Sequence, residues 1–189
     1  MTAGDLRRWG LPRAIRCLER GELIAYPTEA VYGLGCDPLD RQAVARLLAL
    51  KRRPVSKGLI LIAADFRQLA PYIRPLPPQR MAPVLASWPG PHTWLLPASP
   101  AVPEWLRGAH STLAVRVTAH PLAAALCRAW GGPLVSTSAN RAGQPPATCA
   151  LRVRCLFHPH LCCVLPGPTG GLERPTPIRD GRSGRQVRI

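Results

Sequence analysis

The stretch from residue 23 to residue 64 reads LIAYPTEAVYGLGCDPLDRQAVARLLALKRRPVSKGLILIAA and carries the clearest signals of strands and helices in the chain. It opens with four apolar residues and then Pro27, which predicts a buried strand ending in a turn, because proline cannot donate to a continuing strand ladder. Residues 27–35 predict a polar loop, and Asp40 is suited to cap a helix over the apolar positions that follow. Residues 59–62 predict the next buried strand. This order indicates an α/β fold, in which ligands meet strand ends.

Four cations gather where the predicted helix ends: Lys51, Arg52, Arg53 and Lys57. They precede the second strand directly, so they are expected at the rim of the sheet, where an ammonium group can contact a triphosphate as a movable point charge. The chain has 25 basic residues, and its two lysines both fall in this cluster. The alternative is structural, because cations at a helix C-terminus also interact favourably with the helix dipole.

Composition narrows the class of protein. A chain of 189 residues with 47% hydrophobic residues predicts one folded domain, and the net charge of +15 favours polyanionic partners such as nucleotides or nucleic acid. Seven cysteines without a C-x-x-C spacing predict reduced thiols rather than a disulfide framework or a zinc site. No run resembles a signal peptide or a membrane span, which predicts a cytoplasmic protein with no membrane partner.

The remaining chain predicts further elements of both kinds. Helices are expected over residues 11–20, 65–72, 79–87, 121–130 and 148–157, and strands over residues 92–97, 111–117, 133–135 and 162–165. Residues 174–189 form a basic tail that is either solvated or part of a binding surface. The sequence contains neither a P-loop nor a G-x-G-x-x-G motif, which excludes those two nucleotide sites.

Two polar features stand out in this second half. Alternation along residues 111–117 places Leu113, Val115 and Val117 on one face and Arg116 on the other, where it is either exposed or faces a cleft and binds a carboxylate. Residues 136–140 read STSAN at a strand end. Several small polar groups there favour a ligand-facing loop, whereas a helix cap would need only one.

Four blocks, taken together, resemble the YrdC/TsaC family, the bacterial threonylcarbamoyl-AMP synthases. They are YPTEAVYGLG at 26–35, KRRPVSKGL at 51–59, LAVRV at 113–117 and STSAN at 136–140. The likeness runs from about residue 9 to residue 188 and matches the short form. It implies a single YrdC-like domain over residues 1–189 without a second C-terminal domain, built as an α/β fold with a twisted mixed sheet, flanking helices and a basic concave groove.

The resemblance also implies a reaction. A nucleotidyltransferase would join L-threonine, bicarbonate or CO2, and ATP into threonylcarbamoyl-AMP and pyrophosphate, for t6A modification at position 37 of tRNA. Mg²⁺ would arrive with ATP, and t6A transferase subunits would act downstream. The alternative is a non-catalytic module whose basic groove binds double-stranded RNA or tRNA.

The family motifs imply particular site residues. Lys51 and Arg53 are the implied catalytic residues, and the chain itself supplies no metal ligand. The implied ATP contacts are Lys51, Arg53, Lys57, Thr112, Ser138, Asn140 and Arg188. The implied threonine contacts are Thr28, Tyr32, Arg116, Ser136 and Thr176. The chain departs from the family pattern at three positions: Ala30 stands where many relatives have threonine, Ile62 stands where the long forms have histidine, and Pro146 replaces a common serine.

Overall fold

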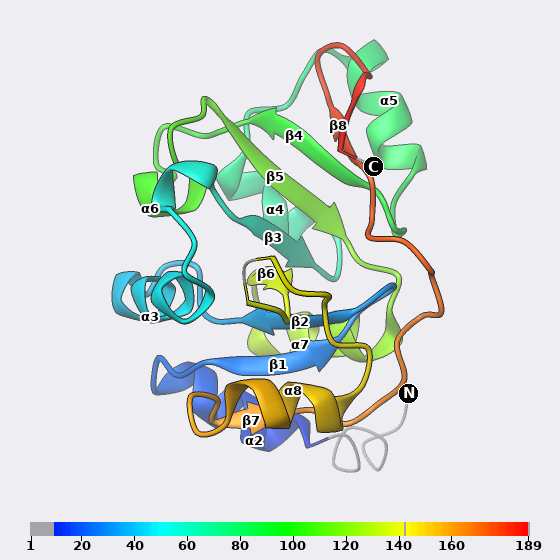
Figure 1. Ribbon diagram of the computed structural model, residues 1–189. Coiled ribbons are helices and arrows are strands. Elements are labelled where there is room, and N and C mark those ends of the chain that lie inside the picture. Colours follow the sequence, from blue (N-terminus) through cyan, green and yellow to red (C-terminus); the bar gives the residue numbers. More distant parts are fainter. Residues whose placement is uncertain (1–9, 142, 189) are drawn as a thin grey trace.

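Residues 10–141 and 143–188 are described by a computed structural model, and their strands form one nine-stranded sheet (Figure 1). Across the sheet the order is β7-β1-β2-β6-β3-β5-β4-β8-β9. The strands are β1 Ile24–Pro27, β2 Tyr32–Gly35, β3 Ile60–Ala63, β4 Thr93–Pro97, β5 Thr112–Val117, β6 Leu134–Ser138, β7 Cys163–Val164, β8 Ile178–Asp180 and β9 Gln186–Arg188. The helices are α2 Leu11–Glu19, α3 Arg41–Lys51, α4 Phe66–Leu69, α5 Pro78–Ala86, α6 Glu104–Arg107, α7 Pro121–Trp130 and α8 Ala150–Phe157, with single 3₁₀ turns at η1 Val55–Lys57 and η2 Ala70–Tyr72.

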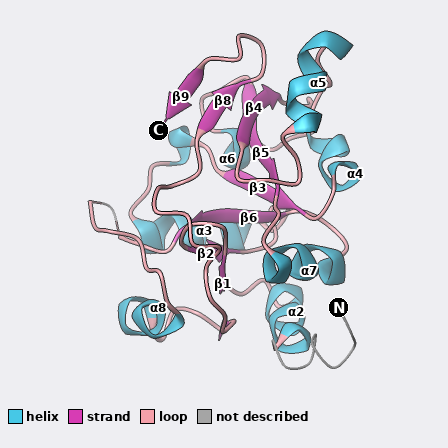
Figure 2. Ribbon diagram, turned by 90° about the vertical axis from the view of Figure 1, so that its right-hand side faces the viewer, coloured by secondary structure: helices cyan, strands magenta, loops and turns pink. Residues whose placement is uncertain are grey.

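The sheet is mixed and strongly twisted. Strand pairs β1–β7, β3–β5 and β4–β8 are parallel, and the other neighbouring pairs are antiparallel. Figures 1 and 2 show that β3, β4 and β5 are rotated against β1 and β2, as expected when the twist between neighbouring strands accumulates. The predicted α/β fold, with a twisted mixed sheet and flanking helices, is confirmed.

Strand β6 joins the two halves of the sheet. It pairs with β2 through Gly33 and Ser138, and with β3 through Ile60 and Ser136. Strand β3 in turn pairs with β5, which carries Arg116. Sequence blocks that are more than a hundred residues apart therefore lie on neighbouring strands.

Helices cover both faces of the sheet. Leu113, Val115 and Val117 of β5 belong to one apolar cluster that includes the inner face of α3, which confirms their predicted alternation. Ile24 of β1 and Ile62 of β3 belong to a second cluster that includes α2 and α7. Burial of apolar area on both faces makes the sheet the rigid support of the molecule.

Helix α3 begins and ends as its sequence predicts. The Asp40 carboxylate accepts from the backbone N–H groups of Gln42, at 2.8 Å, and Ala43, at 3.0 Å, and so satisfies donors that the first turn leaves free. Arg52 ends the helix in the left-handed conformation, with φ of 51°. Lys51 is thereby left in the last turn, next to the loop after β6.

Two loops predicted from the sequence are strands. Residues 32–35 form β2, and β6 continues through Ser138. Glycine is depleted in strands, which led to the loop prediction. At residue 35 close packing requires glycine. A Cβ on Gly35 would lie 2.5 Å from the carbonyl oxygen of Val135 and 2.8 Å from the Tyr26 ring.

The basic tail is also more ordered than a solvated end. Residues 178–180 form β8, which pairs with β4, and residues 186–188 form β9, which pairs with β8. Helix α6 lies within residues 98–110, for which the sequence predicted no helix. Both elements are short, so their few residues carry little periodicity of their own.

The prediction of reduced cysteines is wrong for one pair. Cys17 in α2 and Cys162 before β7 form a disulfide, with Cα atoms 6.0 Å apart and a sequence separation of 145. Spacing along the chain cannot reveal such a pair, because the tertiary fold alone brings the two residues together. The other five cysteines are free.

Two further expectations concern the whole chain. Within the described residues, no helix combines the length and the apolar character that crossing a membrane requires. The single domain over residues 1–189 remains a prediction.

Candidate active site

A cavity of about 300 Å³ lies where β2, β6, β3 and β5 adjoin the end of α3. Ten of the residues implied by the sequence contribute to it, from five separate parts of the chain. Its lining comprises Thr28, Ala30, Val31, Tyr32, Gly33, Lys51, Arg52, Arg53, Pro54, Lys57, Ile60, Arg116, Ser136, Thr137, Ser138, Asn140, Gly143, Pro175 and Thr176.

Lys51 is directed from α3 into the loop that follows β6. Its ammonium donates to the backbone carbonyl of Ser138, to the carbonyl of Asn140 at 2.8 Å and to the Asn140 side-chain oxygen at 3.1 Å. The residue is 6% exposed, and burial, followed by the charge of Arg53, lowers the pKa of Lys51 to about 8. Lys51 is therefore mostly protonated at neutral pH but close to its titration range.

Arg53 and Lys57 stand at the rim of the cavity. The Arg53 guanidinium donates to the carbonyl of Gly58 at 2.9 Å from Nη2 and at 3.2 Å from Nε, which ties it to the turn after η1. Lys57 is exposed. Together with Lys51, these groups give one side of the cavity a concentration of positive charge.

Ser138 and Asn140 form a connected polar loop. The Ser138 hydroxyl donates to the Asn140 side-chain oxygen at 2.6 Å, and the Asn140 amide donates to the carbonyl of Gln144 at 2.7 Å. Lys51 donates to the same Asn140 oxygen. The S-x-N and K-x-R motifs are thus joined by hydrogen bonds, which fix the loop against the end of α3.

Arg116 is buried rather than exposed. It is 4% exposed, and its Nη1 donates to the hydroxyl groups of Thr176, at 2.6 Å, and Thr93, at 3.3 Å. Its Nη2 lies 3.4 Å from Oε2 of Glu29, whose side chain is also buried. Among the described residues, the Nε of Arg116 and Oε2 of Glu29 have no hydrogen-bond partner.

Glu29 is fixed from the opposite side. Its Oε1 accepts from the Thr118 hydroxyl at 2.7 Å and from the Ala119 backbone N–H at 3.1 Å. Glu29 is not part of the cavity lining, so its charge supports Arg116 from behind. A guanidinium held in this way, with hydrogen-bonding capacity left over, is suited to receive a carboxylate from the cavity side.

The other implied threonine contacts surround Arg116 in different ways. Ser136 and Thr176 are buried at the cavity wall, and the Thr28 hydroxyl donates to the carbonyl of Val31 at 2.7 Å. Tyr32 also lies at the wall, but it is fully buried and its hydroxyl donates to the carbonyl of Gly167 at 2.6 Å. The structure therefore gives the Tyr32 hydroxyl a role in fixing the segment after β7.

Of the other implied ATP contacts, Thr112 is not among the described lining residues. Thr112 begins β5, and the side chain of Arg188 lies outside the described residues. Of the three departures from the family pattern, Ala30 lines the cavity, whereas Ile62 is fully buried in the core beside α2 and α7, and Pro146 is not among the lining residues.

Sequence reasoning missed two partners of Arg116. It did not assign Thr93, which lies on β4, and it gave Glu29 no role beyond that of a polar loop residue. The available signal was that a buried guanidinium needs hydrogen-bond partners. That signal does not identify the carboxylate that pairs with it. Arg52, which lines the cavity and has a positive φ, was noted only as one of the cations.

Residues 16–189 match a protein-family model, Sua5_yciO_yrdC, described as "Telomere recombination". The chain belongs to this family. Relatives include the threonylcarbamoyl-AMP synthase of Halorhodospira halophila, 61% identical over 90% of this chain and 90% of that protein, and that of Nitrosococcus oceani, 57% identical over 95% of this chain and 97% of that protein.

Solved structures of the Sua5/YciO/YrdC family agree with the fold. The crystal structure of Pyrococcus abyssi Sua5 complexed with L-threonine is 35% identical, with a TM-score of 0.85, and the match covers 91% of this chain and 51% of that one. Escherichia coli YciO, at 24% identity and a TM-score of 0.83, supports the fold alone; the match covers 95% of this chain and 87% of that one.

Proposed function

We propose that this member of the Sua5/YciO/YrdC family is an L-threonylcarbamoyladenylate synthase, a nucleotidyltransferase that uses L-threonine, bicarbonate or CO2, and ATP. One observation carries the proposal: a single cavity offers two separate places for anions. The cluster of Lys51, Arg53 and Lys57 suits phosphates, and Arg116 suits a carboxylate. The names of the curated relatives support the same assignment.

The two anion sites are offset from each other along strand β6. Arg116 is level with Ile62, which pairs with Leu134, while Lys51 contacts Ser138, four residues further along β6. At about 3.3 Å per residue, this separates the two levels by about 13 Å along the strand. An amino acid that binds through its carboxylate at Arg116 can then direct its amine toward a nucleotide held at Lys51.

The amino-acid end relies on the Arg116 network. The guanidinium binds the threonine carboxylate, and Glu29 and Thr176 hold it in the required orientation. Ser136 and Thr28 line the same cavity. Binding the amino acid by its carboxylate leaves the amine free to react.

The chemistry needs cations more than a general base. The neutral threonine amine combines with CO2 and releases a proton to water to form a carbamate, and a carbamate oxygen attacks the α-phosphorus of ATP. The bond from this phosphorus to the bridging oxygen breaks, and pyrophosphate leaves. Because the carbamate is already anionic, the main task is to stabilise charge that develops on the phosphate oxygens, which Lys51, Arg53 and Lys57 are placed to do.

Mg²⁺ enters this proposal on the nucleotide. The hydroxyl and amide oxygens of Ser138 and Asn140 are of a type that Mg²⁺ accepts, but no carboxylate is part of the cavity lining in the described residues. We therefore assign the ion to the ATP phosphates, where it neutralises charge and helps to orient the phosphate chain. We further propose that the product passes to t6A transferase subunits and that the enzyme acts in the cytoplasm.

The test is pyrophosphate release by the purified protein. We expect release that requires ATP, L-threonine and bicarbonate together, and that falls at least 100-fold in Lys51→Ala, because the buried positive charge that stabilises the developing phosphate charge is lost. Arg80→Ala, which removes an exposed arginine on α5, is the matched control and should retain activity. Release that is independent of threonine in folded protein would contradict the proposal.

A second cavity favours tRNA or double-stranded RNA as an additional partner. Arg46, Arg52, Arg141 and His160 line it, and Arg52 lines the first cavity as well. Such a surface can follow a phosphate backbone from one cavity to the other. RNA affinity should then fall steeply with added salt, and affinity that is insensitive to salt would contradict this role.

A further inference from the structure

We propose that Cys17 and Cys162 form a reversible thiol–disulfide exchange site that reacts with small-molecule thiols, and that Arg20 stabilises the thiolates that the reaction releases. The site is separate from the cavity that holds the nucleotide and threonine, because none of these three residues lines that cavity. Its test therefore does not depend on the proposed enzyme activity.

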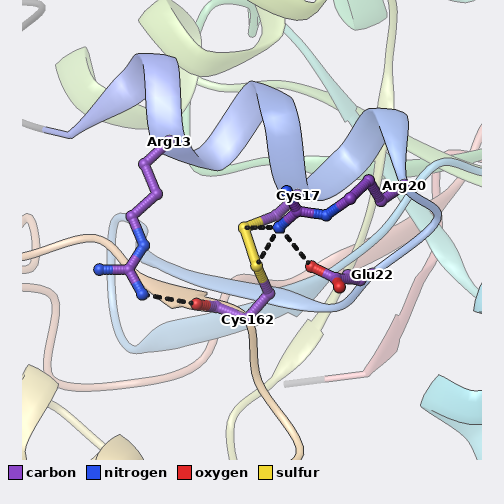
Figure 3. The surroundings of a disulfide bond; sticks show 5 residues. All are labelled: Arg13, Cys17, Arg20, Glu22 and Cys162. Atoms are coloured by element: carbon purple, nitrogen blue, oxygen red, sulfur yellow. Dashed lines mark hydrogen bonds and ion pairs between the residues drawn. A yellow bond between two sulfur atoms is a disulfide. The ribbon is translucent and has the colours of Figure 1, made fainter.

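Figure 3 shows the arginine beside both sulfur atoms. The Arg20 Nη2 lies 3.3 Å from Sγ of Cys162 and 4.0 Å from Sγ of Cys17, and it donates to Oε2 of Glu22 at 3.0 Å. A guanidinium this close favours a thiolate over a thiol, which makes the reduced pair more reactive than ordinary cysteines. The Glu22 carboxylate pairs with the same guanidinium in an ion pair whose side chains are 58% and 42% exposed.

The same arginine argues against a metal site. Cys17, Cys162 and Glu22 offer ligand atoms that lie within 4.8 Å of one another, which would suit a metal ion. However, the Arg20 guanidinium contacts all three of these residues and is itself a cation. A metal ion would have to displace the Arg20 guanidinium, whereas thiol exchange requires the guanidinium in its observed position.

The two sulfur atoms differ in access. Cys17 is fully buried within the core cluster beside α7, whereas Cys162 is partly exposed. A thiolate RS⁻ therefore attacks Cys162, forming a mixed disulfide and releasing Cys17 as a thiolate beside Arg20. A second RS⁻ attacks the RS sulfur, releases Cys162 and forms RSSR. Two RSH are oxidised, the protein disulfide is reduced by two electrons, and the two protons pass to the protein sulfurs.

The disulfide adds a covalent link between α2 and the segment before β7, and hydrogen bonds already connect that segment to β1. The N–H of Cys162 donates to the carbonyl of Leu23 at 2.9 Å, and the N–H of Leu165 donates to the carbonyl of Ala25 at 2.8 Å. Strand β7 therefore remains paired with β1 when the disulfide is reduced. The expected consequence of reduction is a loss of thermal stability with retention of the fold.

The experiment is a redox titration of the full chain in glutathione buffers of graded GSH to GSSG ratio. Differential alkylation read by mass spectrometry distinguishes Cys17 and Cys162 from the exposed thiols of Cys149 and Cys155. We expect Cys17 and Cys162 to change together and reversibly, and the melting temperature to be about 5–15 °C higher in the oxidised protein, as a disulfide closing so long a loop should give. In Cys162→Ser the melting temperature should not respond to reductant.

Matched arginine variants test the part played by Arg20. At pH 7 the rate of iodoacetamide reaction at Cys162 in the reduced protein should fall about 3- to 10-fold in Arg20→Met, because fewer molecules carry the thiolate. Arg16→Met, an exposed change on the same helix, should leave the rate unchanged. Equal rates in Arg20→Met and wild type, or a pair that stays reduced in GSSG, would overturn the proposal. Zn²⁺ binding by the reduced protein that is lost in Cys17→Ser would also overturn it in favour of a metal site.

Discussion

At the scale of single residues, the site depends on charges held out of water. Lys51 and Arg116 are each at most 6% exposed, and each is held by named hydrogen bonds rather than by solvent. Held groups of this kind act on a substrate without first reorganising. Their titration and their partners can therefore be tested one residue at a time.

The pKa of Lys51 predicts how ATP binding depends on pH. Since the free protein releases this proton near pH 8, affinity for a non-hydrolysable ATP analogue should fall about tenfold between pH 7 and pH 9. Calorimetry without threonine measures binding alone and avoids the pH dependence of carbamate formation. Lys51→Arg keeps the positive charge and should remove the pH dependence; an unchanged affinity of the wild type at pH 9 would contradict the role of Lys51.

Stability should respond to the same proton in the opposite direction. The unfolded chain keeps the Lys51 proton up to its ordinary pKa of 10.5, while the folded protein loses it near 8. Between these values the unfolded state binds more protons, so the contribution of Lys51 makes the free energy of unfolding rise with pH. Lys51→Arg lacks this contribution, which makes it the reference for the comparison.

Glu29→Gln tests the support of Arg116. The change keeps the shape of the side chain and removes the charge beside the guanidinium, so Arg116 loses its ion pair. We expect the KM for threonine to rise about tenfold and the free energy of unfolding to fall by about 1–3 kcal/mol. The affinity for the ATP analogue without threonine should stay within twofold of wild type.

The comparison variant is Glu104→Gln, which changes an exposed glutamate on α6. This variant should leave the KM for threonine and the affinity for the ATP analogue unchanged. If Glu29→Gln bound threonine as wild type does, Arg116 would not need its buried partner, and the proposed clamp would be wrong.

At the scale of elements, β2 and β6 approach each other closely beside the site because Gly33 and Gly35 of β2 have no side chains. Gly35→Ala would place a methyl group 2.5 Å from the carbonyl of Val135, so the two strands must separate. We expect the free energy of unfolding to fall by about 1–3 kcal/mol in urea denaturation. Gly132→Ala, whose added methyl would have no neighbour closer than 3.8 Å, is the control and should cost less.

The sequence predicted well those elements that carry their own signal. The Asp40 cap and the apolar face of α3 gave the helix, and alternation gave the inner face of β5. The predictions that were wrong concern elements whose structure depends on contacts between residues far apart in sequence. The glycines of β2 favoured a loop in the sequence, whereas in the structure Val135 and Tyr26 pack closely against Gly35. Strand β8 forms because it pairs with β4.

The candidate site divides in the same way. Motifs named the residues, but only the fold shows that Lys51 meets Ser138 and Asn140, or that Arg116 is paired with Glu29. The Cys17–Cys162 pair gave no signal, because the two positions have a sequence separation of 145. Contacts between residues so far apart follow from tertiary structure and not from local pattern.

At the scale of the whole molecule, the twisted sheet brings two anion sites to one cavity. Strand β6 places the serine–asparagine loop beside α3, and β5 carries Arg116 two strands away. The net charge of +15 adds a general attraction for phosphates. We propose that a nucleotide and an amino acid occupy this cavity together.

A crystal structure of the protein with L-threonine and a non-hydrolysable ATP analogue tests this claim most directly. We predict the threonine carboxylate on Arg116, the phosphates on Lys51 and Arg53, and the amine directed toward the α-phosphate. A nucleotide bound elsewhere, or threonine bound away from Arg116 with its amine directed away from the phosphates, would contradict the account.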